Sequence, residues 1–421
     1  MRSLLYLKMQ KFCFTFFVLT VCLFACKTSK ISSVSVNDHH TVLDSIFNTS
    51  AELKDFISRK DFLRIQIIYT QIDRDENNRP HFTLHNFNEN RQLYFYPAST
   101  VKMPTAFLAL ERLNKLNIAG LDKYSTMKMD SSYLYPAIQT SVADYVKRIF
   151  LVSDNDAFNH LYEFLGQQYI NEQLHGKSYT DAQIRHRLQI FLTPEQNRQT
   201  GEVNFYDSTN KLLYHQPSQY SKIKFSKRKD FLGNAHINYN DSFVNEPFDF
   251  SPKNRIYLQD LTNILRSVIF PESVSADQRF DLTQNDYKFL YRYMSEYPSE
   301  SKEFNYDTST YYDAYAKLLL YGSEKIKPDS SIRIFNKEGD AYGFLTDIAY
   351  IVDFDKKIEF ILSATIFCDT DGVINDDKVE YDTIGYPFMK ALGQAVYQYE
   401  LQRKREHVPD LSKFKIDYTT F

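Results

Sequence analysis

Apolar residues follow two different periods along the chain, and strand-like runs lie near both of its ends. Near the N-terminus, residues 64–72 and 81–85 are rich in β-branched and aromatic residues, and the polar stretch 73–80 separates them. Such runs predict a β-hairpin with a loop between its two strands. Before the hairpin, apolar residues at 42–57 recur every three or four positions, which predicts a helix.

Towards the C-terminus the pattern predicts strands again. Long β-branched runs at 344–352 and 357–366 are joined by the polar loop 353–356, and another strand is predicted at 332–339. Residues 382–400 then have helical spacing. Strands at both ends with helices between them predict the α+β class, as an α/β sandwich. Its antiparallel sheet is formed by the N- and C-terminal segments and flanked by helices.

The region between the strands has mainly helical spacing. A long helical region is predicted at 101–175, in which Ser153, Asp154 and Asn155 separate two apolar-periodic stretches. These residue types are common N-caps, so by themselves the three are adequately explained as a junction between helices. Further helices are predicted at 257–270, 285–294 and 311–321. The middle of the chain is therefore predicted to be a mostly helical subdomain.

The first 25 residues differ from the rest of the chain. Three basic residues precede an almost unbroken apolar run at 12–23, which is too short for a stable membrane span and typical of a secretory signal. The run Leu-Phe-Ala-Cys ends at Cys26 and resembles the lipobox of bacterial lipoproteins, in which the cysteine is lipidated. The alternative is a signal peptide that is cleaved elsewhere.

Lipidation would make Cys26 the first residue of the mature chain and hold the protein on a bacterial membrane, outside the cytoplasm. Residues 26–41 are polar and contain several serines, which is consistent with a short tether. The predicted localisation is therefore the cell envelope, with the membrane bound through the lipid on Cys26.

Cysteine usage and charge limit the cofactors and partners. Of the 4 cysteines, two lie in the predicted signal and Cys26 would be acylated, so Cys368 alone can form neither an intramolecular disulfide nor a cysteine metal site. The 10 histidines show no metal-binding spacing, and no metal is predicted.

Removal of residues 1–25 takes three basic residues and no acidic one from the 50 basic and 53 acidic residues of the chain. The net charge then falls from −3 to −6, which argues against a nucleic-acid partner. The basic residues at 221–230 are interpreted as a solvated face.

One polar pair lies where a helix is predicted to begin. In Ser99-x-x-Lys102 the serine and lysine are three residues apart, which places both side chains on one face of a helix. A serine hydroxyl becomes a nucleophile when a base removes its proton, and a desolvated lysine with a lowered pKa can be that base. The spacing alone is also compatible with a serine near a helix start and an exposed lysine.

Two later motifs give this pair a context. Ser153-Asp154-Asn155 lies between two predicted helices, and Lys337-Glu338-Gly339 lies on a strand that precedes another strand. Together with Pro-Ala-Ser-Thr-Val-Lys at a helix start, their order and setting resemble the penicillin-recognising serine hydrolases, and within them the class A β-lactamases.

The resemblance implies a catalytic role for four side chains. Ser99 would attack an acyl carbonyl and form an acyl-enzyme, and Lys102 would take its proton directly or through water. Ser153, held beside Lys337, would pass a proton to the leaving nitrogen, because an amide nitrogen cannot leave as an anion. Lys337 would also help to keep Lys102 deprotonated and would attract a substrate carboxylate.

The resemblance also implies how the substrate is held. Asn155 would hydrogen-bond a substrate amide. The backbone N–H groups of Ser99 and of Asp340, which follows Gly339, would form the oxyanion hole.

A first departure from the family pattern concerns hydrolysis of the acyl-enzyme. In class A enzymes a glutamate on a loop after Ser-Asp-Asn activates the hydrolytic water, with an asparagine four residues later. Aligning Pro194 and Asn197 with that pattern puts Thr193 where the glutamate is expected. Glu195 lies two residues further on and could serve only if the loop were rebuilt. Deacylation is therefore expected to be slow, as in penicillin-binding proteins.

A second departure is Glu338, because the family has a threonine or serine there whose hydroxyl binds the substrate carboxylate. A glutamate would bring like charge towards that carboxylate, at a cost of about 1 kcal/mol or more in a partly desolvated site. Either Glu338 points away from the substrate, or the substrate lacks that carboxylate.

The predicted organisation follows from these features. A signal peptide at 1–25 and a lipidated tether at 26–41 precede a serine hydrolase domain at 42–403 and a C-terminal tail at 404–421. Within the domain, 42–98 with 331–403 form the α/β part and 99–330 the helical part. The span between the second and third motifs is longer than in class A enzymes, and the insertion near 200–310 is expected to reshape the pocket mouth.

The predicted function is a serine hydrolase that acts on an amide or β-lactam through an acyl-enzyme at Ser99, without a cofactor. A small molecule or a peptidoglycan peptide is the expected substrate. The alternatives are a DD-peptidase or penicillin-binding type of lipoprotein, and a surface lipoprotein that binds cell-wall peptide without turning it over.

Overall fold

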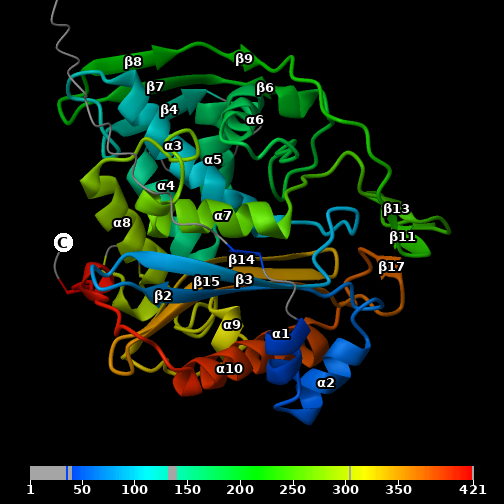
Figure 1. Ribbon diagram of the computed structural model, residues 1–421. Coiled ribbons are helices and arrows are strands. Elements are labelled where there is room, and N and C mark those ends of the chain that lie inside the picture. Colours follow the sequence, from blue (N-terminus) through cyan, green and yellow to red (C-terminus); the bar gives the residue numbers. More distant parts are fainter. Residues whose placement is uncertain (1–34, 37–39, 131–139, 303–304, 420–421) are drawn as a thin grey trace, which may run out of the picture. The chain divides into compact units, whose positions relative to one another are not determined.

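The computed structural model describes residues 35–36, 40–130, 140–302 and 305–419 (Figure 1). The predicted signal peptide, Cys26 and most of the tether lie outside the described residues. The helices are α1 (His40–Phe47), α2 (Ala51–Ser58), α3 (Lys102–Leu116), α4 (Val142–Val152), α5 (Asn155–Leu165), α6 (Gln167–Gly176), α7 (Leu258–Ile269), α8 (Gln284–Ser295), α9 (Leu318–Tyr321) and α10 (Tyr386–Gln402).

The strands lie in several sheets. In chain order they are β1 (Ser35–Val36), β2 (Gln66–Arg74), β3 (Pro80–Phe87), β4 (Thr126–Asp130), β5 (Thr140–Ser141), β6 (Gln199–Thr200), β7 (Glu202–Tyr206), β8 (Leu212–Gln216), β9 (Gln219–Tyr220), β10 (Phe231–Leu232), β11 (Ala235–Ile237), β12 (Phe243–Val244), β13 (Phe248–Asp249), β14 (Ile332–Ala341), β15 (Phe344–Asp353), β16 (Ile358–Phe367) and β17 (Val373–Ile374).

The main sheet has the order β1-β3-β2-β16-β15-β14. Its longer strands are antiparallel to their neighbours, and β16 lies beside β2 with Phe360 opposite Gln71. The N- and C-terminal segments therefore share one sheet, which confirms the predicted α+β class. Every residue of β15 and β16 is buried, because helices cover both faces of the sheet, and this explains their nearly continuous apolar sequence.

Two groups of helices cover the sheet (Figure 1). On one face α1, α2 and α10 pack together, and the rings of Phe56 and Phe388 lie 5.6 Å apart there. On the other face α7 and α8 lie next to the sheet, and α3, α4 and α5 pack with them around a second apolar core. None of the helices within the described residues is long and apolar enough to cross a membrane.

Two of the predicted helices differ from the structure. The helix expected at 42–57 is divided into α1 and α2, because the Ser50 hydroxyl accepts a hydrogen bond from the Leu53 N–H (3.0 Å) and begins a second helix. The helix expected at 311–321 is wrong over most of its length, since only α9 is helical. Leu320 has a φ of 95°, which is incompatible with a regular helix.

The predicted mostly helical part, 99–330, is only partly helical. A strand that the sequence pattern did not indicate, β4, joins β7 and β8 in a small sheet of order β5-β4-β7-β8. Within the predicted insertion, residues 199–249 form short strands rather than helices. These strands are brief, and β8 has mostly exposed or half-buried residues, so they lack a clear period of two.

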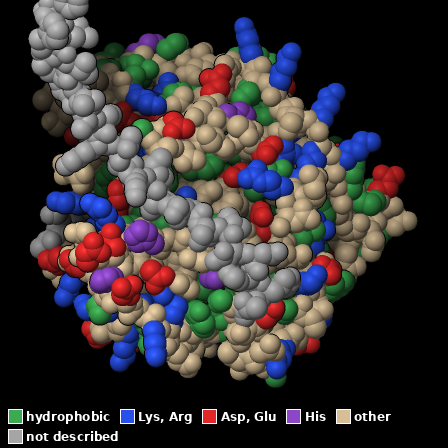
Figure 2. Space-filling model, in the orientation of Figure 1, with side chains coloured by type: hydrophobic (Ala, Val, Ile, Leu, Met, Phe, Trp, Pro, Cys, Tyr) green, Lys and Arg blue, Asp and Glu red, His purple; other side chains and the backbone are tan. Residues whose placement is uncertain are grey.

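The basic stretch at 221–230 is largely exposed, as expected, although its fifth basic residue, Arg228, is half-buried and pairs with the buried Asp230 (2.7 Å). Its four lysines, Lys222, Lys224, Lys227 and Lys229, are all exposed. Figure 2 shows Lys and Arg side chains at the upper right of the drawn face, with Asp and Glu side chains among them.

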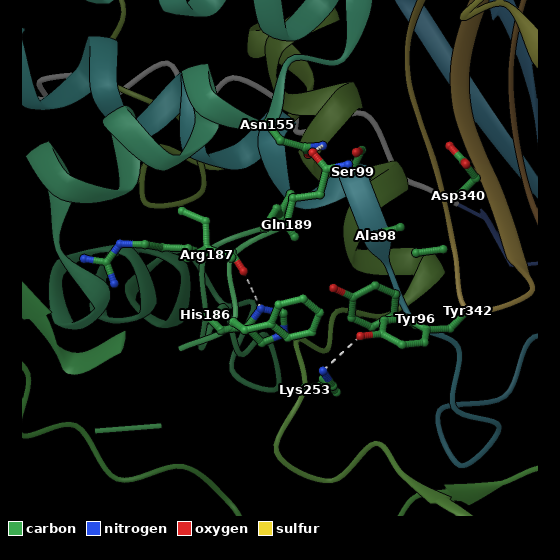
Figure 3. A pocket seen from close by; sticks show the side chains of 14 residues that line it. Tyr96, Ala98, Ser99, Asn155, His186, Arg187, Gln189, Lys253, Asp340 and Tyr342 are labelled. Carbon is green, nitrogen blue, oxygen red and sulfur yellow. Dashed lines mark hydrogen bonds between the residues drawn. The ribbon is translucent and has the colours of Figure 1, made fainter. Parts of the chain in front are cut away.

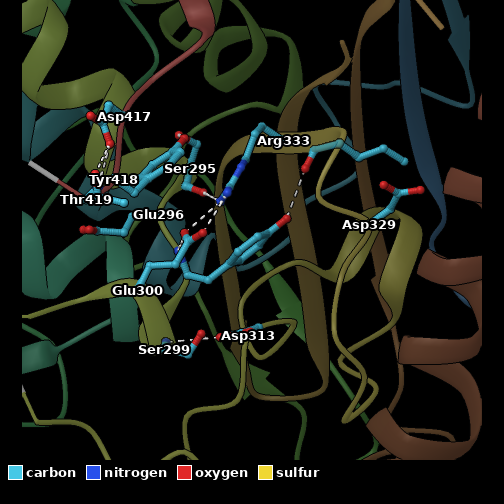
Figure 4. Close-up of polar contacts among 12 residues, drawn as sticks. Ser295, Glu296, Ser299, Glu300, Asp313, Asp329, Arg333, Asp417, Tyr418 and Thr419 are labelled. Atoms are coloured by element: carbon cyan, nitrogen blue, oxygen red, sulfur yellow. Dashed lines mark hydrogen bonds and ion pairs between the residues drawn. The ribbon is translucent and has the colours of Figure 1, made fainter. Parts of the chain in front are cut away.

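The C-terminal segment, 404–421, was predicted to be a separate tail, but it packs on the same core as the hydrolase domain. The ring of Phe414 is buried 4.9 Å from that of Tyr350 on β15. Figure 4 shows the polar contacts around Tyr418, whose hydroxyl is hydrogen-bonded to Ser295 (2.7 Å) and whose ring stacks 4.1 Å from the Arg333 guanidinium. Arg333 in turn pairs with Glu300 (2.7 Å), so the segment is held against β14.

Candidate active site

Ser99 lies in a short 3-10 helix, Ala98–Val101, that leads directly into α3. The Thr100 hydroxyl donates a hydrogen bond to the Pro97 carbonyl (2.6 Å), which stabilises this turn. Ala98 has a φ of 44°, an uncommon value for a residue with a side chain. Ser99 itself is half-buried and lines a pocket, so its hydroxyl is accessible at the start of a helix.

Strand β14 approaches this turn closely at Gly339. A Cβ atom at this position would lie 2.7 Å from the Ser99 amide nitrogen and 2.9 Å from the Pro97 carbonyl oxygen. Only glycine fits at such a distance from backbone atoms. The third motif is therefore placed directly against the backbone of the first, and Asp340, the next residue, lines the pocket beside Ser99.

Lys102 is completely buried at the first turn of α3. Its Nζ donates hydrogen bonds to the Ser153 carbonyl and, over 3.3 Å, to the Ser153 hydroxyl. Burial and the neighbouring Lys337 ammonium hold the pKa of Lys102 well below its ordinary value. A lowered pKa favours the neutral amine, the form in which a lysine can act as a general base.

Ser153 lies between the two lysines because of the junction between α4 and α5. It ends α4 in the left-handed conformation (φ 57°), and Asp154 caps α5 by accepting a hydrogen bond from the Ala157 N–H (3.0 Å). The junction thus directs the Ser153 hydroxyl towards β14, where Lys337 Nζ donates a hydrogen bond to it (2.9 Å).

Glu338 is turned towards Lys337. Its carboxylate accepts a hydrogen bond from Lys337 Nζ (2.7 Å), and both side chains are buried. Burial alone would raise the pKa of Glu338, but the Lys337 ammonium lowers it, so the carboxylate is charged. The positive charge expected to attract a substrate carboxylate is consequently balanced inside the protein.

Asn155 is hydrogen-bonded to a residue that the sequence analysis did not select. Its side-chain amide donates to Gln189 Oε1 (2.8 Å), and both residues line the pocket of Ser99 (Figure 3). Gln189 has a φ of 56°, so a constrained backbone presents its side chain here. Gln189 therefore occupies the place beside Ser99 and Asn155 that the sequence analysis sought for Thr193 or Glu195.

Thr193 and Glu195 do not line this pocket. Both are exposed, and Glu195 interacts with the Tyr220 hydroxyl, whose pKa it raises. Asn197 is buried and structural, since its side-chain oxygen accepts a hydrogen bond from the Arg187 N–H (3.0 Å). The alignment on Pro194 and Asn197 was the source of the error.

A buried ion pair holds the segment that carries Gln189. Arg187 Nη2 lies 2.6 Å from Glu163 Oε1 on α5, and neither side chain is exposed. Glu163 also accepts a hydrogen bond from the Gly201 N–H (3.0 Å), which ties both ends of the loop to α5. The position of Gln189 thus depends on Glu163.

We expect Glu163→Gln to lower the free energy of unfolding by about 3 kcal/mol, because it leaves the buried Arg187 guanidinium without its countercharge. Chemical denaturation of both proteins measures the difference. Glu324→Gln is the matched control, since the Glu324–Lys390 pair is partly exposed and is expected to contribute less than about 1 kcal/mol. Equal losses in the two variants would contradict a special role for the buried pair.

The sequence pattern described as the beta-lactamase enzyme family matches residues 48–284, more than half of the chain. The chain belongs to the β-lactamase enzyme family. The match includes the first two motifs of the family and the loop with Gln189, while β14 lies beyond it. No curated protein matches the chain.

Solved structures similar to the chain include β-lactamases and PBP-A. A β-lactamase from Xanthomonas campestris pv. campestris is 14% identical, with a TM-score of 0.48, over 82% of this chain and 97% of that one. A β-lactamase from Burkholderia ambifaria is 11% identical, with a TM-score of 0.46, over 82% and 98%. The structure of PBP-A is 13% identical, with a TM-score of 0.47, over 87% and 100%.

The candidate site of this family member thus combines four side chains. Lys102 and Lys337 both donate hydrogen bonds to Ser153, and Ser99 lies in the turn that leads into Lys102. Within the described residues, no group of three or more His, Cys, Asp or Glu side chains is arranged to hold a metal ion. Cys368 is buried, and burial raises the pKa of its thiol, as expected for a small apolar residue in the core.

Proposed function

We propose that the chain is a penicillin-binding type of serine hydrolase, which forms an acyl-enzyme at Ser99 on an amide or β-lactam and hydrolyses it slowly. The buried Lys102 carries this proposal. Its lowered pKa and its hydrogen bonds to Ser153 support a neutral amine that can exchange protons with both serines.

In the proposed acylation, Lys102 Nζ takes the proton of Ser99 Oγ while Oγ attacks the acyl carbonyl carbon. The N–H groups of Ser99 and Asp340 stabilise the resulting oxyanion. The proton then passes from Lys102 through the Ser153 hydroxyl to the leaving nitrogen, and the carbon–nitrogen bond breaks. Lys337 donates a hydrogen bond to Ser153 Oγ and so fixes the direction of this transfer.

Slow deacylation is supported by the groups around Ser99. Gln189 contacts Asn155 in the pocket, but a carboxamide cannot take a proton from water at neutral pH. The nearby carboxylate of the loop, Glu195, is exposed and interacts with Tyr220 instead. The acyl-enzyme is therefore expected to persist.

The pairing of Glu338 with Lys337 favours a second candidate, a protein that binds cell-wall peptide without turning it over. Repeated turnover of any acyl substrate would exclude this candidate.

For either function we propose that the protein is lipidated at Cys26 and held on the outer side of a bacterial membrane, as the N-terminal sequence indicates.

We expect a fluorescent penicillin to label Ser99 in a single burst of about one equivalent, followed by slow release. Gel fluorescence and intact mass measure the label, and hydrolysis of a chromogenic cephalosporin measures turnover. Ser99→Ala is expected to remain unlabelled. Equal labelling of wild type and Ser99→Ala would overturn the proposal.

A further inference from the structure

The pocket beside Ser99 has a volume of about 320 Å³. Asn155 and Gln189 line it, whereas Ser153 and Lys337 do not. In the proposed function, which this inference deepens, Ser153 serves the leaving nitrogen and Asn155 the amide on the acyl side. The pocket therefore receives the acyl half of the substrate, the part that stays on Ser99.

Lys253 lies at the other end of this pocket in the view of Figure 3. It comes from the inserted segment, between β13 and α7, and its ammonium donates a hydrogen bond to the Tyr342 hydroxyl (3.1 Å). The rings of Phe248 and Tyr342 lie 5.5 and 5.1 Å from the ammonium. None of the ion pairs among the described residues includes Lys253, so its charge has no carboxylate partner in that part of the chain.

The other basic residues of the pocket wall are not available to an anion. His186 Nδ1 donates to the Arg187 carbonyl (2.7 Å) and its Nε2 accepts from the Asn254 N–H (3.3 Å), which fixes a neutral tautomer. Burial first, and then Lys253, lower the pKa of His186 to about 4. The guanidinium of Arg187 is bound by Glu163. Among the described residues that line the pocket, Lys253 is therefore the cation left to bind an anion.

The walls between Ser99 and Lys253 suit a chain with an apolar middle. Tyr96 stacks on His186 with an angle of 6° between the rings, and Tyr342 stands edge-on to Tyr96 at 5.1 Å. Ile190 and Phe191 line the same pocket. At its end, the Tyr342 hydroxyl accepts its hydrogen bond from Lys253, so its own proton is left to donate to a ligand.

We propose that Lys253 and the Tyr342 hydroxyl bind a carboxylate at the end of the acyl chain, so that the protein selects amides and lactams whose acyl half carries an anion. At the opposite side of Ser99, Glu338 balances the charge of Lys337. In this proposal the cation that binds the substrate's anion is therefore Lys253 of the inserted segment, and not Lys337 of the third motif.

Acyl-D-alanine phenylthioesters test this proposal, because the phenylthio half of the substrate carries no carboxylate that could bind elsewhere in the site. Succinyl, adipoyl and suberoyl derivatives with a free terminal carboxylate are each compared with the corresponding methyl ester. Intact mass spectrometry measures the rate of Ser99 acylation. In the wild type, at least one free acid is expected to react about tenfold faster than its methyl ester, and Lys253→Met is expected to abolish this preference.

The control variant is Lys224→Met, which removes an exposed lysine of the same insertion and is expected to keep the preference. Lys253→Glu is expected to favour an acyl chain that ends in an ammonium over one that ends in a carboxylate. Equal rates for every acid and its ester in the wild type would overturn the proposal, and so would a preference that survives in Lys253→Met.

A binding measurement separates this proposal from the proposed function. Calorimetric titration of Ser99→Ala with the corresponding adipoyl, suberoyl and succinyl D-alanine amides requires no acylation. Tighter binding of an acid than of its ester, lost when Lys253→Met is added, supports the proposal even if Ser99 is never acylated. If a fluorophosphonate and the thioesters label Ser99 but no acid binds more tightly than its ester, the proposed function stands and the role of Lys253 is excluded.

Discussion

A Lys102→Met variant is expected to acylate Ser99 about 10³-fold more slowly than the wild type, since a general base contributes a factor of roughly 10²–10⁴. Methionine keeps the length and apolar stem of lysine, so the packing at the start of α3 is retained. What is lost is the group that accepts the Ser99 proton and hydrogen-bonds Ser153. The rate of labelling by a fluorescent penicillin measures the effect, with the exposed Lys222→Met as the control.

The same variant is expected to be at least as stable as the wild type at pH 7, and this distinguishes lost catalysis from lost folding. The pKa of Lys102 is lower in the folded protein than the ordinary 10.5. Between the folded and the unfolded pKa of Lys102, the unfolded chain binds more protons than the folded protein. Burial of Lys102 therefore lowers the free energy of unfolding at low pH, and this free energy rises as the pH approaches 10.5. Methionine removes this dependence.

Thermal melts from pH 6 to pH 9 test both expectations. The wild type is expected to gain stability with pH more steeply than Lys102→Met. A variant that labels slowly and also melts at a clearly lower temperature at pH 7 would mean that Lys102 serves the fold rather than the reaction.

The parts of the fold that could be predicted are those whose sequence pattern reflects burial. β15 and β16 are covered on both faces, so each has a long apolar run, and the helices at 258–269 and 284–295 have one apolar side. The junction at Ser153 was predictable because its residues are caps. Each of these signals is local, and the tertiary structure does not oppose it.

The parts that could not be predicted depend on contacts between distant residues. The sequence at 311–321 has helical spacing, but the close approach of the backbone at Leu320 to Gly393 on α10 requires a different conformation. Phe414 lies in a polar C-terminal stretch, and only the structure shows that it completes an aromatic cluster with Tyr350. Local sequence carries no sign of such partners.

The candidate site shows the same division. The three motifs could be recognised from residue types and spacing, and the structure brings their side chains together. The pairing of Glu338 with Lys337 and the approach of Gln189 to Asn155 depend on how a strand and a loop face the pocket. Lys253 was not selected because it lies in none of the three motifs.

A Gln189→Glu variant is expected to release its acyl group at least about tenfold faster than the wild type, because a positioned carboxylate can act as general base for water. Glutamate is nearly identical in shape to glutamine. Its carboxylate can still accept the hydrogen bond that Asn155 now donates to Gln189. The change therefore adds proton-accepting capacity beside Ser99 with little disturbance of the loop.

The lifetime of the acyl-enzyme after removal of excess penicillin measures this change, by intact mass or by return of free Ser99. Acylation itself is expected to change less, since Lys102 and Ser153 are untouched. Gln189→Met is the control for shape, because it fills the same space without a base, and it is expected to leave the acyl-enzyme long-lived.

A second control concerns the glutamate that the loop already contains. Glu195 is exposed and directed to Tyr220, so Glu195→Gln is expected to leave the lifetime of the acyl-enzyme unchanged. Faster release in Gln189→Glu together with no effect of Glu195→Gln would assign slow deacylation to the carboxamide at position 189. A longer lifetime in Glu195→Gln would instead show that the loop moves Glu195 to Ser99 during the reaction.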